Sequence, residues 1–225
     1  MVNEKDIGLV ESIFSFWDKL TPQQESLILG NSIYTNYKRG ENIHHGNNDC
    51  VGVLLIKSGE LRTYILSEDG RDITLYRLGA GDVCILSGAS CILKNITFDV
   101  HIDAEKDSEL ISINSAVFQQ LCNENIYAEN FSYKSTIDRF SDVMWTIQQI
   151  LFLSFDKRLT NFLLDEISRS GSNTIVMTHE QIAKYIGSAR EVVSRMLKYF
   201  EKEGYIKLSR GKIEVIDAVQ LKEII

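Results

Sequence analysis

Near the C-terminal end of the chain, charged and polar side chains recur at the spacing of one helix face. At about 100° per residue, the segment REVVSRMLK (190–198) gathers its polar residues on one side and its apolar residues on the other. Such a face can read DNA bases, because an arginine donates two parallel hydrogen bonds to guanine and a carboxylate accepts one from cytosine. The predicted base-reading residues are Arg190, Glu191, Ser194 and Arg195.

Two short helices and a hairpin are predicted to position this face. The first helix, 178–187, opens with a capping box of Thr178 and Gln181 and ends at Gly187. The second begins after Ser188, which we expect to cap it, and two short strands (205–208 and 212–216) follow Gly204. The inward sides are apolar: Ile182, Ala183 and Ile186, then Val192, Val193, Met196, Leu197 and Phe200. This order of elements predicts a winged helix-turn-helix.

The charge distribution favours DNA as the ligand of this region. The chain has a net charge of −7, yet residues 184–212 hold eight Lys or Arg against three Asp or Glu. In the alternative interpretation, Glu191 only caps its helix and the arginines only face solvent, which leaves the basic hairpin unexplained. The predicted contacts to backbone phosphates are Thr178, Lys184, Ser188, Lys198, Lys207, Arg210 and Lys212.

Residues 32–113 form short apolar or alternating runs divided by turn residues. Many short strands at regular spacing predict an antiparallel β-sandwich or jelly roll, and Asp69-Gly70 predicts a hairpin. Two helices are expected before it, one with Val10, Ile13, Phe14 and Trp17 on one face and one capped at Thr21.

From 115 to 153 the chain has no proline or glycine, which predicts a short helix and then a long one. A long amphipathic helix needs a partner for its apolar stripe, and a second copy of itself is the simplest one. The alternative is that the helix packs only on its own sheet. The predicted dimerisation residues are Phe131, Ile137, Phe140, Met144, Ile147 and Leu151.

This order of elements and motifs resembles the Crp/Fnr family of bacterial transcription regulators over nearly the whole chain. The motifs are Lys38-Arg39-Gly40-Glu41, Ser58-Gly59-Glu60, Gly81-Asp82, Arg190-Glu191 with Ser194-Arg195, and Arg210-Gly211-Lys212. The resemblance implies an α+β chain with a cyclic-nucleotide-binding-like sensor (1–114), connecting and dimerisation helices (115–153) and a winged helix-turn-helix (154–225). It also implies a homodimer that reads a palindrome with TGA or GTGA half-sites, and RNA polymerase as a partner.

The sensor is not expected to bind cyclic AMP. Family members that do so use a Gly-Glu pair and an Arg-Ser pair, which align here with Ile85-Leu86 and Phe98-Asp99. Asp99 would place a carboxylate near the incoming phosphate, and Phe98 cannot pair with it. The effector is therefore an unidentified small molecule or a redox signal. The expected pocket residues are Cys84, Leu86, Ser87, Cys91, Phe98 and Asp99; alternatively, Cys84 and Cys91 are only core thiols.

No cofactor is expected. The N-terminal cysteine cluster that holds iron–sulfur in Fnr is absent, because the first cysteine is Cys50. The adjacent His44 and His45 would point to opposite faces of a strand, so they cannot ligate one metal together. The sequence shows no nucleophile elbow, phosphate loop or metal-binding histidine cluster, which argues against an enzyme. With no apolar run long enough for a membrane helix and no basic secretory start, we expect a cytoplasmic protein without a membrane partner.

Overall fold

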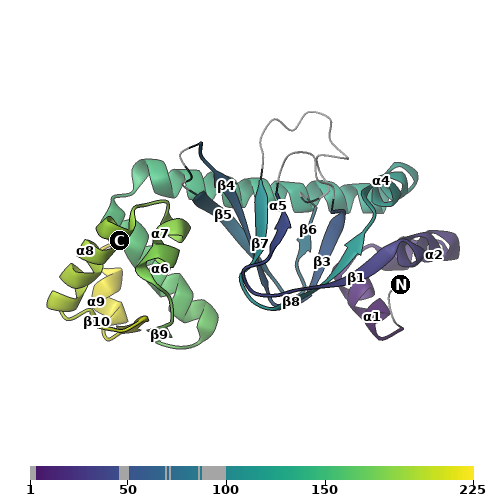
Figure 1. Ribbon diagram of the computed structural model, residues 1–225. Helices are drawn as coiled ribbons and strands as arrows, with labels where there is room; N and C mark the ends of the chain where they lie inside the picture. The colour runs from purple at the N-terminus through teal and green to yellow at the C-terminus, as the bar shows by residue number, and fades with distance from the viewer. Residues whose placement is uncertain (1–3, 46–50, 69, 71, 86, 88–99) are drawn as a thin grey trace. The chain divides into compact units, whose positions relative to one another are not determined.

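The computed structural model of the protein describes residues 4–45, 51–68, 70, 72–85, 87 and 100–225 (Figure 1). The chain forms two compact units, one of Met1–Leu66 with Leu75–Val143 and one of Ser67–Thr74 with Met144–Ile225. No helix in the described ranges is both long and apolar enough to cross a membrane.

The first unit contains the predicted antiparallel sandwich, except for residues 72–74 at the start of one strand, which are grouped with the second unit. One sheet has the order β1-β8-β3-β6, formed by Ser32–Tyr37, Ser108–Ile113, Val53–Ser58 and Val83–Cys84. The other has the order β2-β7-β4-β5, formed by Asn42–His44, His101–Ala104, Glu60–Leu66 and Asp72–Gly79. The neighbouring β4 and β5 confirm the predicted hairpin, although Asp69 itself lies outside the described residues.

Strand β3 is buried on both faces, which explains its unbroken apolar run. Leu54 and Ile56 join the core between the two sheets. Val53 and Leu55 point the other way, against the helices α1 (Glu4–Ile13), α2 (Pro22–Gly30) and α4 (Ser115–Glu124). Successive side chains of β3 therefore enter two different apolar cores. In a strand with one face in solvent, only every second side chain would be buried.

The N-terminal helix is shorter than the sequence predicts. Helix α1 ends at Ile13, and a separate 3-10 turn, η1 (Trp17–Lys19), follows it. Phe14 and Trp17 therefore do not continue one helix face, but Phe14 is still fully buried and stacks on Phe16 with ring centres 5.0 Å apart. The predicted capping box of Thr21 and Gln24 at the start of α2 is confirmed.

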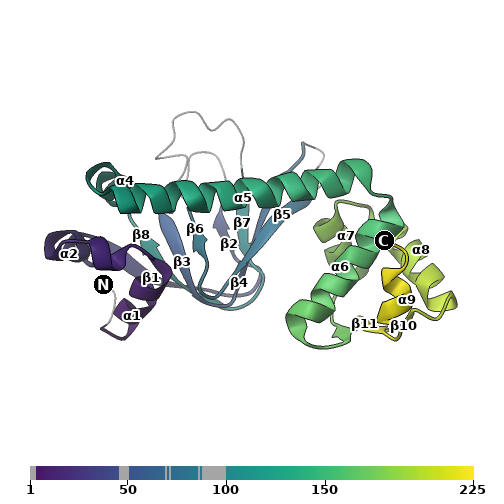
Figure 2. The ribbon, with the colours of Figure 1, turned by 180° about the vertical axis from the view of Figure 1, so that it is seen from behind.

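Helix α5 (Ile126–Phe152) is the predicted long helix, and its part up to Val143 runs along the sandwich (Figure 2). Its inward side meets the sensor through Ala128, Phe131 and Val143, and the Arg139 guanidinium lies over the Tyr76 ring at 5.2 Å.

The second unit contains the predicted winged helix-turn-helix. Its helices are α6 (Phe155–Ser170), α7 (His179–Ile186), α8 (Arg190–Lys202) and α9 (Ala218–Lys222). Its sheet has the order β10-β11-β9, from Ile206–Ser209, Lys212–Val215 and Thr174–Ile175, so the predicted extended segment 175–177 is paired only at its start. One apolar cluster joins all of these elements, with Leu163, Ile182, Leu197 and Phe200 among its buried members.

Candidate DNA-binding surface

Helix α8 divides sharply into a buried side and an exposed polar side. Val193, Leu197 and Phe200 are fully buried. Arg190, Glu191, Arg195 and Lys198 are exposed and Ser194 is half-buried, all within about 140° of the helix circumference. Val192 differs from its prediction: it is only half-buried and lies outside the core cluster.

The turn between α7 and α8 fixes where the polar side of α8 begins. The capping box of Thr178 and Gln181 is formed, and Gly187 ends α7 in the left-handed conformation at φ +60°. Arg158 of α6 donates from Nη1 to the Ile186 carbonyl at 3.0 Å, which anchors the turn to the neighbouring helix.

Ser188 does not cap α8, contrary to the sequence prediction. Its backbone amide donates to the Ala183 carbonyl at 2.9 Å and so completes the end of α7. The N-cap of α8 is Ala189, one residue later, and no side chain caps this helix. Because Gly187 is left-handed, the residue after it, Ser188, bonds back to α7 and belongs to the turn that ends this helix. Ser188 therefore cannot also cap α8.

The wing is tied directly to the end of α8. The Glu201 carboxylate accepts a hydrogen bond from the Leu208 amide at 2.8 Å, and Ile206 and Val215 of the hairpin are buried in the shared core. The basic side chains of the wing therefore keep a fixed place relative to α8. Those side chains are Lys207, Arg210 and Lys212, all exposed.

The predicted phosphate contacts on the two helices have different surroundings. Thr178 and Lys198 are exposed and Ser188 is half-buried. Lys184 is also exposed, but its Nζ lies 3.5 Å from the carboxylate of Asp72, which belongs to the same compact unit.

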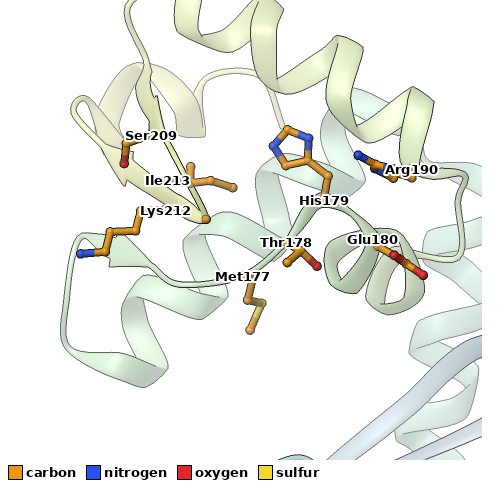
Figure 3. A pocket seen from close by; sticks show the side chains of 9 residues that line it. Met177, Thr178, His179, Glu180, Arg190, Ser209, Lys212 and Ile213 are labelled. Carbon is orange, nitrogen blue, oxygen red and sulfur yellow. The ribbon is translucent and has the colours of Figure 1, made fainter.

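A cleft of about 350 Å³ lies between the start of α7, the start of α8 and the wing. Figure 3 shows His179 and Arg190 on one side of it and Ser209 and Lys212 of the wing on the other. Burial lowers the pKa of His179, and the positive charges of Arg190 and Lys198 lower it further. Sequence reasoning gave His179 no role, and its position next to the Thr178 cap was the only available signal.

In the sensor, the structure describes two of the predicted effector-pocket residues, Cys84 and Ser87, and both are buried. Cys84 is in no disulfide and is 1% exposed, in the cluster between the two sheets. The Ser87 hydroxyl is buried and donates to the carbonyl oxygens of Gly52 at 2.6 Å and Cys84 at 3.0 Å. The other four candidates, Leu86, Cys91, Phe98 and Asp99, lie outside the described residues.

The described residues contain no group of three or more His, Cys, Asp or Glu side chains that could hold a metal ion. His44 is buried and the adjacent His45 is exposed, as expected for successive positions at a strand end.

Helix α5 carries an exposed apolar stripe. Ile137, Phe140 and Leu151 are 64%, 64% and 67% exposed. Met144 and Ile147 are exposed on the same side, within about 80° of these residues, and so is Tyr133, which the sequence prediction did not include.

Phe131 does not belong to that stripe, which corrects its predicted role. It lies about 160° around α5 from the stripe and makes edge-on ring contacts with Phe14 at 5.5 Å and Phe16 at 5.2 Å. The sequence prediction allowed a spacing of either three or four residues between apolar positions. Over a helix of this length the angular error adds up, so a residue from the opposite side was included.

Two family models match the chain in the order of the two structural parts. The cyclic nucleotide-binding domain matches residues 34–125, and the Crp-like helix-turn-helix domain matches residues 157–224.

Relatives match over most of their length. A crystal structure of a Crp/Fnr-family protein from Eubacterium rectale is 48% identical, with a TM-score of 0.91 and 95% of this chain and 99% of that chain covered. The cyclic AMP receptor protein of Thermus thermophilus is 25% identical over 91% of this chain and 94% of its own. The cAMP-activated global transcriptional regulator Vfr of Pseudomonas aeruginosa is 23% identical over 87% of this chain and 95% of its own.

Proposed function

This chain belongs to the Crp/Fnr family of DNA-binding transcription regulators, and we propose that it acts as a homodimer that reads a palindrome with TGA-like half-sites. In this proposal each α8 enters a major groove, with Arg190, Glu191, Ser194 and Arg195 at the base edges. Thr178, Ser188, Lys198 and the basic wing residues contact the phosphates on either side. The observation that carries the proposal is the exposed polar side of α8, whose opposite side packs Val193, Leu197 and Phe200 into the core.

We assign the dimer interface to the exposed apolar stripe of α5. Two copies of a long helix that pair along such a stripe bury it on both chains at once, as in a coiled coil. The occupant is a second copy because a palindrome needs two identical readers related by a two-fold axis. RNA polymerase is the further partner expected of a transcription regulator.

Selection from random-sequence duplexes tests this proposal. We expect the full-length protein to enrich a palindrome whose half-sites contain TGA or GTGA, with centres about 34 Å apart, one turn of B-form DNA. The enriched pool should then protect both half-sites in a footprint. Enrichment of single, unsymmetrical sites, or of no sequence at all, would contradict the homodimeric reader.

The signal that controls binding is proposed to be an unidentified small molecule or a redox change, and not cyclic AMP. Calorimetric titration with cyclic AMP should give no measurable binding, because Phe98 and Asp99 replace the phosphate-binding pair and cost a few kcal/mol. The cyclic AMP receptor protein of Thermus thermophilus serves as the positive control. A micromolar dissociation constant for this chain would overturn the prediction.

The effector itself is best sought in the native protein. Mass spectrometry of the small molecules that co-purify with it, compared under reducing and oxidising conditions, separates a bound ligand from a Cys84 and Cys91 redox change.

A further inference from the structure

The cleft between α7, α8 and the wing combines three properties, and the histidine in it has no role in the proposed function. It is open to solvent beside the proposed base-reading face, it is lined by the cationic side chains of Arg190 and Lys212, and it contains the only histidine of the winged unit. His179 is half-buried at the edge of this cleft, and Figure 3 shows Arg190 at the start of α8 beside it.

We propose that this cleft seats a phosphate of the DNA backbone and that His179 takes up a proton when the phosphate enters, so that DNA binds more tightly at acidic than at neutral pH. The inference rests on the proposed DNA-binding function and adds that DNA binding is coupled to the uptake of a proton by His179. The ligand is a phosphodiester of the duplex, recognised by charge and hydrogen bonding and not by base sequence.

The charges around His179 set the sign of the effect. In the free protein, burial and the cations Arg190 and Lys198 of α8 hold the pKa of His179 below its usual value, so the ring is mainly neutral at neutral pH. From the wing, Lys212 adds a further positive charge and Ser209 a neutral hydroxyl. Among the residues that the structure describes, Glu180 of α7 is the one carboxylate that lines the cleft.

A phosphate reverses this balance because its negative charge favours the protonated imidazole. The pKa of His179 therefore rises on binding, and each protomer takes up a proton over the pH range between its free and its bound pKa. DNA affinity is highest below the free pKa, falls as pH rises through this range, and levels off above the bound pKa.

The measurement is fluorescence anisotropy of a labelled duplex, at constant ionic strength, from about pH 5.5 to pH 8. Two duplexes serve as probes, one of random sequence and one carrying the selected palindrome. For wild type we expect the dissociation constant to rise with pH on both duplexes. The expected change is about tenfold per protomer for each unit by which binding raises the pKa of His179.

Four variants isolate the contribution of the His179 side chain. His179→Gln should bind weakly with a flat pH profile, and His179→Arg should bind tightly at every pH because its charge is permanent. His45→Gln, an exposed histidine of the sensor, and Glu180→Gln in the cleft should both keep the wild-type slope. Circular dichroism verifies that each variant is folded.

The outcomes separate this inference from the DNA-binding function. A flat profile for wild type, or an unchanged slope in His179→Gln, would overturn the proton linkage and leave the DNA-binding function standing. Loss of the slope in Glu180→Gln would assign the proton to the carboxylate and would also overturn it. Failure of wild type to bind either duplex at any pH would overturn both proposals together.

Discussion

Replacing Arg195 with alanine should cost the protein about 1–3 kcal/mol of discrimination between its palindrome and unrelated DNA, roughly a fivefold to 150-fold loss. Arg195 is exposed on the polar side of α8, so its side chain adds little to the core. If its guanidinium donates two hydrogen bonds to a guanine, alanine removes both and the variant distinguishes that base pair poorly. Competition gel shifts with specific and scrambled duplexes measure the ratio.

Lys198→Ala is the matched control for this prediction. Lys198 is equally exposed and lies on the same side of α8, but its single ammonium is assigned to a phosphate. The variant should bind both duplexes more weakly by a similar factor and reduce the salt dependence of binding by about one charge per protomer. Full sequence preference in Arg195→Ala, or loss of preference in Lys198→Ala instead, would contradict the assigned roles.

Replacing Phe140 with aspartate should convert the proposed dimer into monomers and lower the affinity for the selected palindrome by at least about a hundredfold. Burying such an apolar side chain is worth about 1.5–3 kcal/mol, and a symmetric dimer loses this contribution on both chains. In the proposed dimer each introduced carboxylate would also lie unpaired in an apolar interface, where a buried charge is costly. Analytical ultracentrifugation reports the oligomeric state, and gel shift reports the affinity.

The fold should survive this change because Phe140 is 64% exposed in the single chain. The control is Asp138→Lys, which alters an exposed charge about 140° around α5 from the stripe and should leave the dimer intact. A Phe140→Asp variant that stays dimeric at micromolar concentration would show that the chains pair through another surface.

Much of this architecture could be predicted from local signals in the sequence. The capping box of Thr178 and Gln181 and the left-handed Gly187 fix the helix-turn-helix through neighbouring residues alone. The polar and apolar sides of α8 follow from its period, since its core residues leave only one side for charges.

The predictions that were wrong, for Ser188 and Phe131, and the residue that was missed, His179, depend on contacts between elements or on small angular differences. Ser188 has a good capping side chain, but its backbone is already used to close α7. Phe131 fits a loose helical period, yet only the positions of Phe14 and Phe16 reveal that it faces the sensor core. His179 gains its significance from Arg190 and Lys198, whose proximity is a result of the turn between the helices.

Replacing the half-site guanines with 7-deazaguanine is the most direct test that α8 reads bases in the major groove. This analogue lacks only the N7 acceptor, so duplex pairing and phosphate charge are unchanged. Wild type should lose affinity for the modified palindrome, while the variant lacking the contacting arginine, Arg190→Ala or Arg195→Ala, should bind modified and natural duplexes equally well. Equal binding of both duplexes by wild type, or equal losses in wild type and both variants, would contradict the account.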